Sequence, residues 1–190
     1  MAVDWSVAPG TFLAAGPDLA DPNFLHAVVL MCRHTDEGAY GLVINRPSEL
    51  VAREVLQGHV ELAKSAARMF VGGPVSLESL QVLHRAPARI QGGEELADGL
   101  WIGGDLDDIA RYLLEAPADA ERDVRLFMGY SGWGPGQLEF ELAALSWLPA
   151  PGSLGSVFSL DPKGVWRDVV RGLGPRFRPL ADEPPDPNLN

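Results

Sequence analysis

The stretch from Gly129 to Leu142 holds the residues whose types and spacing come nearest to a known chemistry. Gly129-Tyr130-Ser131-Gly132-Trp133 has the context of the strand-to-helix turn on which hydrolases present a nucleophilic serine, but that turn requires Gly-x-Ser-x-Gly. Trp133 occupies the position of the final glycine. A serine nucleophile also needs a base, and the sequence does not show which histidine approaches Ser131: His26, His34, His59 or His84. Because the final glycine is missing and no base can be assigned, we do not expect acyl transfer at Ser131.

The same glycine-rich turn could instead bind phosphate. Gly132–Gly136 lies between the apolar strand expected at 123–130 and the start of a helix, where backbone N–H groups are free and the helix dipole is positive. However, Pro135 removes one donor and no lysine follows as it does in a P-loop. Glu139 and Glu141 already complement the dipole. We interpret the turn as architecture, with Pro135 in the first turn of the helix.

Two strand ends elsewhere, at Asn45–Pro47 and at His84, carry polar groups that could join this turn. Asn45-Arg46-Pro47 follows an apolar strand, where a guanidinium offers forked donors for a carboxylate or a phosphate. The alternative use of Arg46 is a structural ion pair with one of the 26 acidic residues. The residues predicted to form a ligand or partner surface are Asn45, Arg46, His84, Gly132, Trp133 and Gln137.

The spacing of histidine and cysteine predicts no metal site. The four histidines are far apart in the chain, and the single cysteine, Cys32, forms no Cys-x-x-Cys pair. His34 and His84 both end apolar strands and could converge in space. Asp105, Asp107 and Asp108 are explained as helix-capping acids. We therefore expect no catalytic set, no metal and no cofactor.

Composition narrows the classes of function. The 190 residues include 15 basic and 26 acidic side chains, a net charge of −11, which argues against a broad nucleic-acid footprint. One cysteine rules out an intrachain disulfide and suits a reducing compartment, and its place in an apolar run predicts a buried, inert thiol. The longest apolar run, 27–32, is far shorter than the ~20 residues that span a bilayer.

Strands come first in the pattern and helices are interspersed later. Short apolar runs predict strands at 10–15, 27–33, 39–45, 68–71, 80–84, 99–102, 123–130 and 156–160. Caps and apolar stripes predict helices at 49–56 after Ser48, from Asp105, after the glycine turn, and from Asp161. This order predicts an α+β fold rather than a doubly wound one. We expect one domain over 1–178 and a disordered, proline-rich tail over 179–190.

Several segments carry a specific combination of motifs in a fixed order over about residues 9–175. They are GTFLAA (10–15), DPNF (21–24), EGAYGLVINRP (37–47), GGPV (72–75), VLH (82–84), the stretch 129–142, and WL (147–148). In this combination the chain resembles the bacterial AlgH/YqgE family.

The resemblance implies a bent, mostly antiparallel sheet that curls into a partial barrel, with helices packed around it. That family takes its name from a proposed transcriptional regulator of alginate production. Most of its members are uncharacterised, and no accepted catalytic residues exist to carry over. This chain departs from the family pattern after Val75, where Ser76–Gln81 replaces an acid-Arg-Gly run. If that arginine contacts a ligand in the family, the function here is altered.

Residues and resemblance together predict a cytoplasmic, non-enzymatic protein that acts through binding, in transcriptional or other regulation, by contact with a protein partner. We expect no membrane contact, and no direct nucleic-acid binding because of the charge and the lack of a helix-turn-helix. The alternative is a small-anion or nucleotide binder, or an enzyme, that uses Gly132–Gly136 with Asn45, Arg46 or His84 nearby. The sequence predicts neither the partner nor the oligomeric state.

Overall fold

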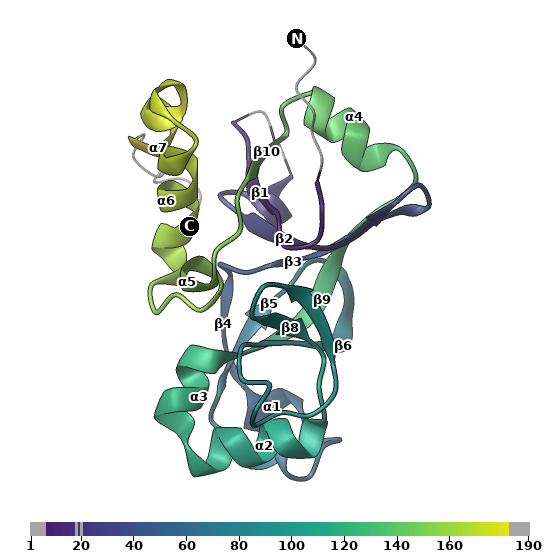
Figure 1. Cartoon of the computed structure of the whole chain (residues 1–190), viewed down its shortest axis with the longest axis vertical. Helices are drawn as coiled ribbons and strands as arrows, with labels where there is room; N and C mark the ends of the chain where they lie inside the picture. The colour runs from purple at the N-terminus through teal and green to yellow at the C-terminus, as the bar shows by residue number, and fades with distance from the viewer. Residues whose placement is uncertain (1–6, 18, 20, 183–190) are drawn as a thin grey trace.

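A single bent sheet runs through the whole of the computed structural model, which describes residues 7–17, 19 and 21–182. Its upper half in Figure 1 consists of four antiparallel strands. In sheet order these are β10 (Trp147–Ala150), β1 (Phe12–Ala15), β2 (Val28–Thr35) and β3 (Gly38–Val43). A hairpin joins β2 to β3.

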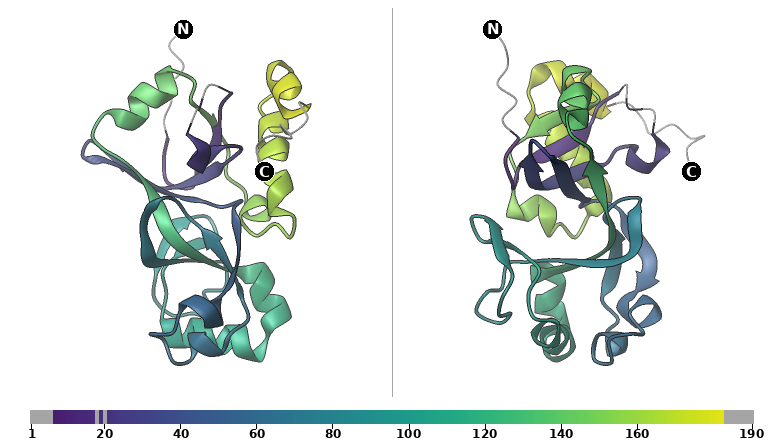
Figure 2. Two further views of the ribbon diagram at one scale, coloured as in Figure 1. Left: turned by 180° about the vertical axis from the view of Figure 1, so that it is seen from behind. Right: turned by 90° about the vertical axis from the view of Figure 1, so that its right-hand side faces the viewer.

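The lower half of the sheet is built on β9 (Val124–Trp133). On one side β9 pairs antiparallel with β6 (Val75–His84), which is followed by β8 (Leu100–Ile102) and β7 (Glu94–Ala97). On the other side β9 pairs parallel with β5 (Arg68–Val71), which in turn pairs with β4 (Pro47–Val51). The fold is α+β, as predicted, and the sheet bends without closing into a barrel (Figure 2).

Strand β9 joins the two halves. Its first part pairs in the lower half, with Leu126 opposite Val82, while its end pairs in the upper half, with Trp133 opposite Ala39. Side chains alternate across a strand, and here Leu126 packs in the lower core and Phe127 in the upper core. Burial on both faces explains why this strand reads as a continuous apolar run.

Helices cover the two halves separately (Figures 1 and 2). The lower half carries α1 (Ala52–Val55), α2 (Leu106–Glu115) and α3 (Pro117–Asp123). The upper half carries α4 (Gln137–Ala143), α5 (Leu154–Val157), α6 (Val165–Gly172) and α7 (Arg178–Asp182). None of the helices in the described part of the chain has the length and hydropathy that crossing a bilayer requires.

Glycines 72 and 73 allow two backbones to touch where β5 runs past β9. Val71 ends β5, and Gly73 follows with φ of 152°. A Cβ atom on Gly73 would lie 2.2 Å from the carbonyl carbon of Tyr130, closer than any real contact. Only glycine fits this crossing, because it has no side chain.

Helix α2 begins as the sequence predicts. The Asp105 side chain accepts hydrogen bonds from the backbone N–H groups of Asp107 and Asp108, both at 3.0 Å. Ile109 and Leu113 are buried on one stripe of the helix. An aspartate at the N-cap and acids in the first turn stabilise the positive end of the dipole.

Three predictions about local structure are wrong. The helix expected at 49–56 is strand β4 as far as Val51, because pairing with β5 overrides local propensity, and only Ala52–Val55 is helical. The strand expected at 156–160 is instead helix α5 and a turn, since the Ser153 hydroxyl accepts from Ser156 N at 3.2 Å and caps a helix. Pro135 lies in the turn before α4 rather than inside the helix.

The structure also revises the expected tail. Residues 179–182, for which the sequence predicted disorder, belong to helix α7. Ala181 in that helix is buried against the upper core. The rest of the predicted tail, 183–190, lies outside the described residues.

Candidate functional site

The glycine-rich turn of the predicted site is organised around a side chain that the sequence did not single out for this role. The Oε2 atom of Glu141 accepts hydrogen bonds from the indole Nε1 of Trp133 at 2.9 Å and of Trp147 at 2.8 Å. Its Oε1 accepts from the Gln137 amide at 2.9 Å, and the Gln137 Oε1 accepts from Gly134 N at 3.1 Å. Gly134 N, the Gln137 amide and the two indole N–H groups are therefore engaged within the protein and are unavailable to an anion.

Ser131 is not placed as a nucleophile. Its side chain is fully buried, and its hydroxyl donates a hydrogen bond to the Gly72 carbonyl at 3.1 Å. A nucleophilic serine needs its hydroxyl exposed and hydrogen-bonded to a base. The geometry thus removes the acyl-transfer interpretation of this motif.

Asn45 and Arg46 hold a neighbouring loop in place. The Asn45 side chain accepts from Val28 N and donates to the His26 carbonyl, both at 2.8 Å. The Arg46 guanidinium donates to the carbonyls of Asn23 and Leu25, the latter at 2.9 Å. Burial lowers the pKa of Arg46, and Asp21 opposes that shift. Both side chains bind the backbone of the β1–β2 segment, and the partners of Arg46 are carbonyls and not the carboxylate that the sequence suggested.

His84 lies apart from these residues, buried in the lower half. Its Nδ1 accepts from Ala86 N at 3.3 Å, so in the neutral ring the proton is on Nε2. That Nε2 has no hydrogen-bond partner among the described residues. Burial lowers the pKa of His84. The residues predicted to share one surface are therefore divided among three places: the α4 turn, the β1–β2 loop and the His84 position.

Gly132 and Trp133 also line a wide, open groove of about 920 Å³ on one face of the sheet. The Tyr40 hydroxyl in its lining donates to Gln81 Oε1 at 2.7 Å. Cys32 lies at its edge, and burial raises the pKa of that thiol to about 12, as a buried inert thiol requires. Among the described residues no group of three or more His, Cys, Asp or Glu side chains is placed to hold a metal.

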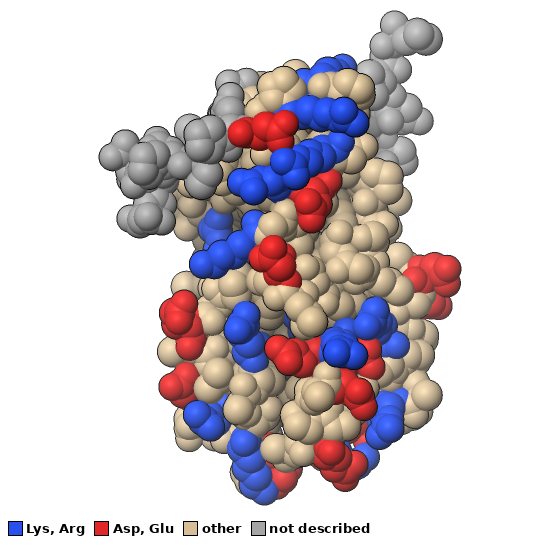
Figure 3. Space-filling view, turned by 90° about the vertical axis from the view of Figure 1, so that its left-hand side faces the viewer, with Lys and Arg blue, Asp and Glu red and all other residues tan. Residues whose placement is uncertain are grey.

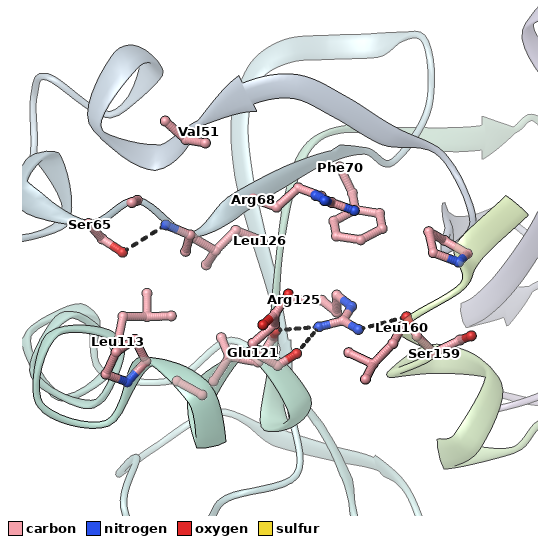
Figure 4. A pocket seen from close by; sticks show the side chains of 16 residues that line it. Val51, Ser65, Arg68, Phe70, Leu113, Glu121, Arg125, Leu126, Ser159 and Leu160 are labelled. Atoms are coloured by element: carbon pink, nitrogen blue, oxygen red, sulfur yellow. Dashed lines mark hydrogen bonds between the residues drawn. The ribbon is translucent and has the colours of Figure 1, made fainter.

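A cavity of about 340 Å³ in the lower half is lined by a buried arginine, a feature that the α4 turn does not have. It lies between helix α3, strands β5 and β9, and the segment Ser159–Pro162 that follows α5 (Figure 4). Its walls are part apolar and part polar, and the apolar part includes Phe70, Leu113 and Leu126. The Arg125 guanidinium lies in the middle of this view, between Glu121 and Ser159.

Arg125 is 5% exposed, and the hydrogen bonds that its guanidinium makes within the described part of the chain all go to backbone carbonyls. Its Nη1 donates to the carbonyls of Glu121 and Val124, the latter at 3.1 Å, and its Nη2 donates to the Ser159 carbonyl at 3.0 Å. Its Nε, shielded from solvent, has no partner in the described part of the chain. The guanidinium carbon also lies 5.3 Å from the centre of the Phe70 ring.

The surroundings of Arg125 disfavour its charge. The pKa of the guanidinium is lowered to about 10, mainly by burial; Arg68 and Arg85 contribute to the lowering, while Glu121 acts in the opposite direction. A buried cation with an unused donor is costly unless an anion completes the site. Basic side chains also cross the face of the molecule that carries α3, α5 and α6 (Figure 3), despite the net charge of −11.

Sequence reasoning missed Arg125 because it treated 123–130 as an apolar strand. The available signal was the single basic residue within that run, which alternation on a doubly buried strand must place inside the protein. Its neighbours in space, Arg68 and Ser159, lie far from it in the sequence.

Comparison with known proteins places the chain in a family. The sequence model of the AlgH-like family matches residues 12–178. The chain belongs to the AlgH-like family. The UPF0301 protein of Chlorobaculum tepidum is 36% identical over 182 residues, covering 96% of this chain and 95% of that protein. The UPF0301 protein of Streptomyces avermitilis is 42% identical over 187 residues, covering 95% and 94%.

Solved structures of the family have the same architecture. The solution structure of the AlgH protein from Pseudomonas aeruginosa is similar with a TM-score of 0.70 and 31% identity, covering 98% of this chain and 99% of that one. The crystal structure of protein DIP2367 from Corynebacterium diphtheriae is similar with a TM-score of 0.69 and 26% identity, covering 93% and 92%. The resemblance read from the sequence is thereby confirmed at the level of family and fold.

Proposed function

We propose that this AlgH-like protein is a binding protein rather than an enzyme, and that its ligand is a small organic anion held by Arg125. The observation that supports this is the buried guanidinium of Arg125, a residue that lines a cavity and is hydrogen-bonded there to backbone carbonyls. The candidate catalytic groups are either engaged in structural hydrogen bonds, as Ser131 is, or absent from this cavity's lining, as His84 is.

An anion would correct the electrostatic imbalance of the cavity. Arg68 and Arg125 both line it, and only Glu121 contributes a carboxylate to the lining. Charge-assisted hydrogen bonds to a guanidinium are stronger than those to neutral carbonyls. The apolar walls supply the burial that gives a small ligand most of its affinity. The alternative hypothesis from the sequence places an anion site at Gly132–Gly136. We propose the Arg125 cavity instead.

We further propose that binding is read out by a protein partner, in a regulatory role in the cytoplasm, as the sequence resemblance implies. The net charge of −11 supports a protein partner over direct contact with nucleic acid. A gel shift that shows tight, sequence-specific and salt-sensitive DNA binding by the purified protein would contradict this part of the proposal.

The test uses isothermal titration calorimetry of the full chain with four probe anions: benzoate, octanoate, phenyl phosphate and benzenesulfonate. We expect at least one to bind the wild-type chain, and to bind Arg125→Met about tenfold or more weakly. Arg111→Met is the matched control, since Arg111 is exposed on α2 and pairs with Asp108 outside the cavity. Binding of none of the four, or equal binding to wild type and Arg125→Met, would overturn the proposal.

A second variant protects the test against a folding defect. Arg68 lines the cavity from an exposed position, so Arg68→Gln should leave the fold intact. We expect Arg68→Gln to weaken binding of the same probe by a smaller factor than Arg125→Met. Far-ultraviolet circular dichroism of each variant establishes that it is folded before the titration.

A further inference from the structure

The C-terminal part of the chain carries a positive charge that the rest of the molecule does not share. Between residues 163 and 178 there are five basic side chains and one acidic side chain, Asp168, so this stretch has a net charge of +4. Because the whole chain carries −11, the remaining residues carry −15. The five basic residues, which we call the C-terminal basic face, are all exposed: Lys163, Arg167, Arg171, Arg176 and Arg178.

The packing of helix α6 on the sheet directs these charges outward. The buried side of the helix includes Trp166, whose indole Nε1 donates to the Ala15 carbonyl at 2.9 Å and fixes the rotation of the helix. Residues four apart share one side of a helix, so Arg167 and Arg171 lie together on the exposed side. Figure 3 looks onto the side of the molecule that carries α6 and α7, and basic side chains gather in its upper part.

Most of this positive charge is not neutralised by the described residues. Arg171 pairs with Asp182, with 2.6 Å between Nη2 and Oδ1. The other four basic side chains of the face form no ion pair with a carboxylate in the described part of the chain. The charge of Arg167 acts on a neighbour instead, because the pKa of His26 is lowered by burial and, in addition, by Arg167. A partner that brings negative groups to this face therefore gains electrostatic free energy.

The small extent of the face argues against a nucleic acid. Helix α6 has 8 residues, so it is about 12 Å long. That length is close to the ~10 Å over which charges act at 0.1 M salt. A DNA duplex carries one charge for every ~1.7 Å of its axis, so it would extend from this face onto residues that together carry −15. A short acidic segment of a protein can stay on the face.

Two further occupants fit the face less well. A second copy of this chain, docked through the same face in a two-fold dimer, would bring like charges together. Basic helices that lie on membranes also bury apolar side chains in the lipid. Within the described stretch 163–178 no large apolar side chain is exposed. The observations therefore favour an acidic protein over a second copy and over a membrane.

We infer that the C-terminal basic face is the docking surface for the protein partner, and that the partner binds it with an acidic segment whose carboxylates pair with the exposed arginines and the lysine. This inference rests on the part of the proposed function that names a protein partner, and it does not depend on the Arg125 cavity. Carboxylates suit a face rich in arginine, because both groups are planar and can share two parallel hydrogen bonds.

Fluorescence anisotropy with labelled peptides tests the chemistry of the partner on the full chain. The probe is an acetylated octapeptide of alternating glutamate and aspartate, and its matched control carries glutamine and asparagine at the same positions. At about 20 mM salt we expect the acidic peptide to bind at least about tenfold more tightly than the control. We expect this binding to weaken about tenfold at about 200 mM salt, because salt screens exposed charges. Equal binding of the two peptides would overturn the inference.

Double variants test the place of binding. Arg167→Gln combined with Arg178→Gln removes two charges of the face, so we expect the acidic peptide to bind about fivefold more weakly than it binds wild type. Arg53→Gln combined with Arg111→Gln is the matched control, because it removes the same number of charges from exposed positions on α1 and α2. An equal loss in the two double variants would show that the peptide responds only to net charge, and the inference would be wrong.

Two more probes decide between the possible occupants. A DNA duplex of about 20 base pairs and vesicles with about 30% phosphatidylserine are titrated under the same conditions. We expect both to bind wild type more weakly than the acidic peptide does. If either binds more tightly, and loses that binding when Arg167 and Arg178 are replaced by glutamine, the face serves a nucleic acid or a membrane and the inference is overturned.

Nuclear magnetic resonance locates the bound peptide directly. In uniformly labelled protein, the backbone amide signals of residues 163–178 should shift on addition of the acidic peptide. The indole Nε1–H signals of Trp133 and Trp147, which are bonded to Glu141, should stay unchanged. Shifts at Arg125 without shifts in 163–178 would place the peptide in the cavity and contradict the inference. The small anions test the cavity in a separate experiment, so either proposal can fail while the other stands.

Discussion

The α4 turn and the Arg125 cavity are both built from polar groups placed beside β9, yet they differ in whether those groups are satisfied. In the turn, the Glu141 carboxylate accepts from two indole N–H groups and one amide. In the cavity, Arg125 donates to three backbone carbonyls and still has an unused Nε. A satisfied polar cluster stabilises the fold, whereas a buried donor left unpaired costs free energy.

Two arginines show the same difference within one residue type. Arg46 donates to the carbonyls of Asn23 and Leu25 and so fixes the 23–25 loop. The sequence suggested a ligand for Arg46 because this residue follows an apolar strand. Arg125 looks like an interruption of a buried strand but lines a cavity. The residue that a motif makes conspicuous is structural here, and the inconspicuous one is the binding candidate.

The largest effect is expected from Glu141→Leu, which removes the acceptor of the turn. Two buried indole N–H groups would lose their partner at a cost of ~1–3 kcal/mol each, so we expect the unfolding free energy to fall by about 2–6 kcal/mol. Urea unfolding measures the loss. Glu139→Leu is the matched control on the same helix, where the exposed pair with His34 contributes at most about 1 kcal/mol. Equal losses of unfolding free energy in the two variants would contradict the claim that Glu141 stabilises the turn.

Arg46→Ala tests the structural arginine. Loss of its two charge-assisted bonds to the Asn23 and Leu25 carbonyls should lower the unfolding free energy by about 1.5–3 kcal/mol. Affinity for the anion that binds the Arg125 cavity should not change, since Arg46 is not part of its lining. A tenfold loss of benzoate affinity in a folded Arg46→Ala protein would contradict the division between the two arginines.

Arg125→Met tests the other arginine in the absence of ligand. Removing the guanidinium takes away three bonds to carbonyls but also relieves the cost of burying a cation, and replacing buried charge by an apolar side chain of similar volume is often nearly neutral. We expect the unfolding free energy to change by no more than about 1 kcal/mol. A loss as large as that of Glu141→Leu would show that Arg125 serves the fold as Glu141 does.

His84 sharpens the comparison because one of its nitrogens is satisfied and the other is not. Burial lowers its pKa in the folded state, so the unfolded chain, with a pKa of about 6.5, binds the proton at higher pH. Stability is therefore expected to fall as the pH drops below about 6.5 and to be retained above it.

The pH profile of urea unfolding measures this effect. His84→Asn, whose amide oxygen can accept from Ala86 N and does not titrate, should show a smaller fall between about pH 7 and pH 5 than the wild type. His59→Asn, at an exposed position, is the control. His26, whose pKa is lowered by burial and by Arg167, accounts for part of the fall that remains. An identical slope in wild type and His84→Asn would contradict the assignment.

Much of the fold could be predicted from the sequence because its signals are local. The apolar runs at 27–33 and 123–130 gave strands at nearly the observed places, and Asp105 with its two following acids gave the start of α2. The motifs from Gly10 to Leu148 gave the family. Predictions failed where a distant partner overrode local preference. Residues 47–51, for example, form a strand because they pair with β5.

The sequence by itself determined the fold class, the family and the acidic net charge, because periodicity, turn residues and composition are properties of neighbouring residues along the chain. Only the tertiary structure decided which polar groups are satisfied. Glu141 meets Trp133 and Trp147, and Arg125 meets Ser159, across a folded chain. A hydrogen bond has its partner or lacks it according to positions in space a few ångströms apart, and the binding candidate follows from that arrangement.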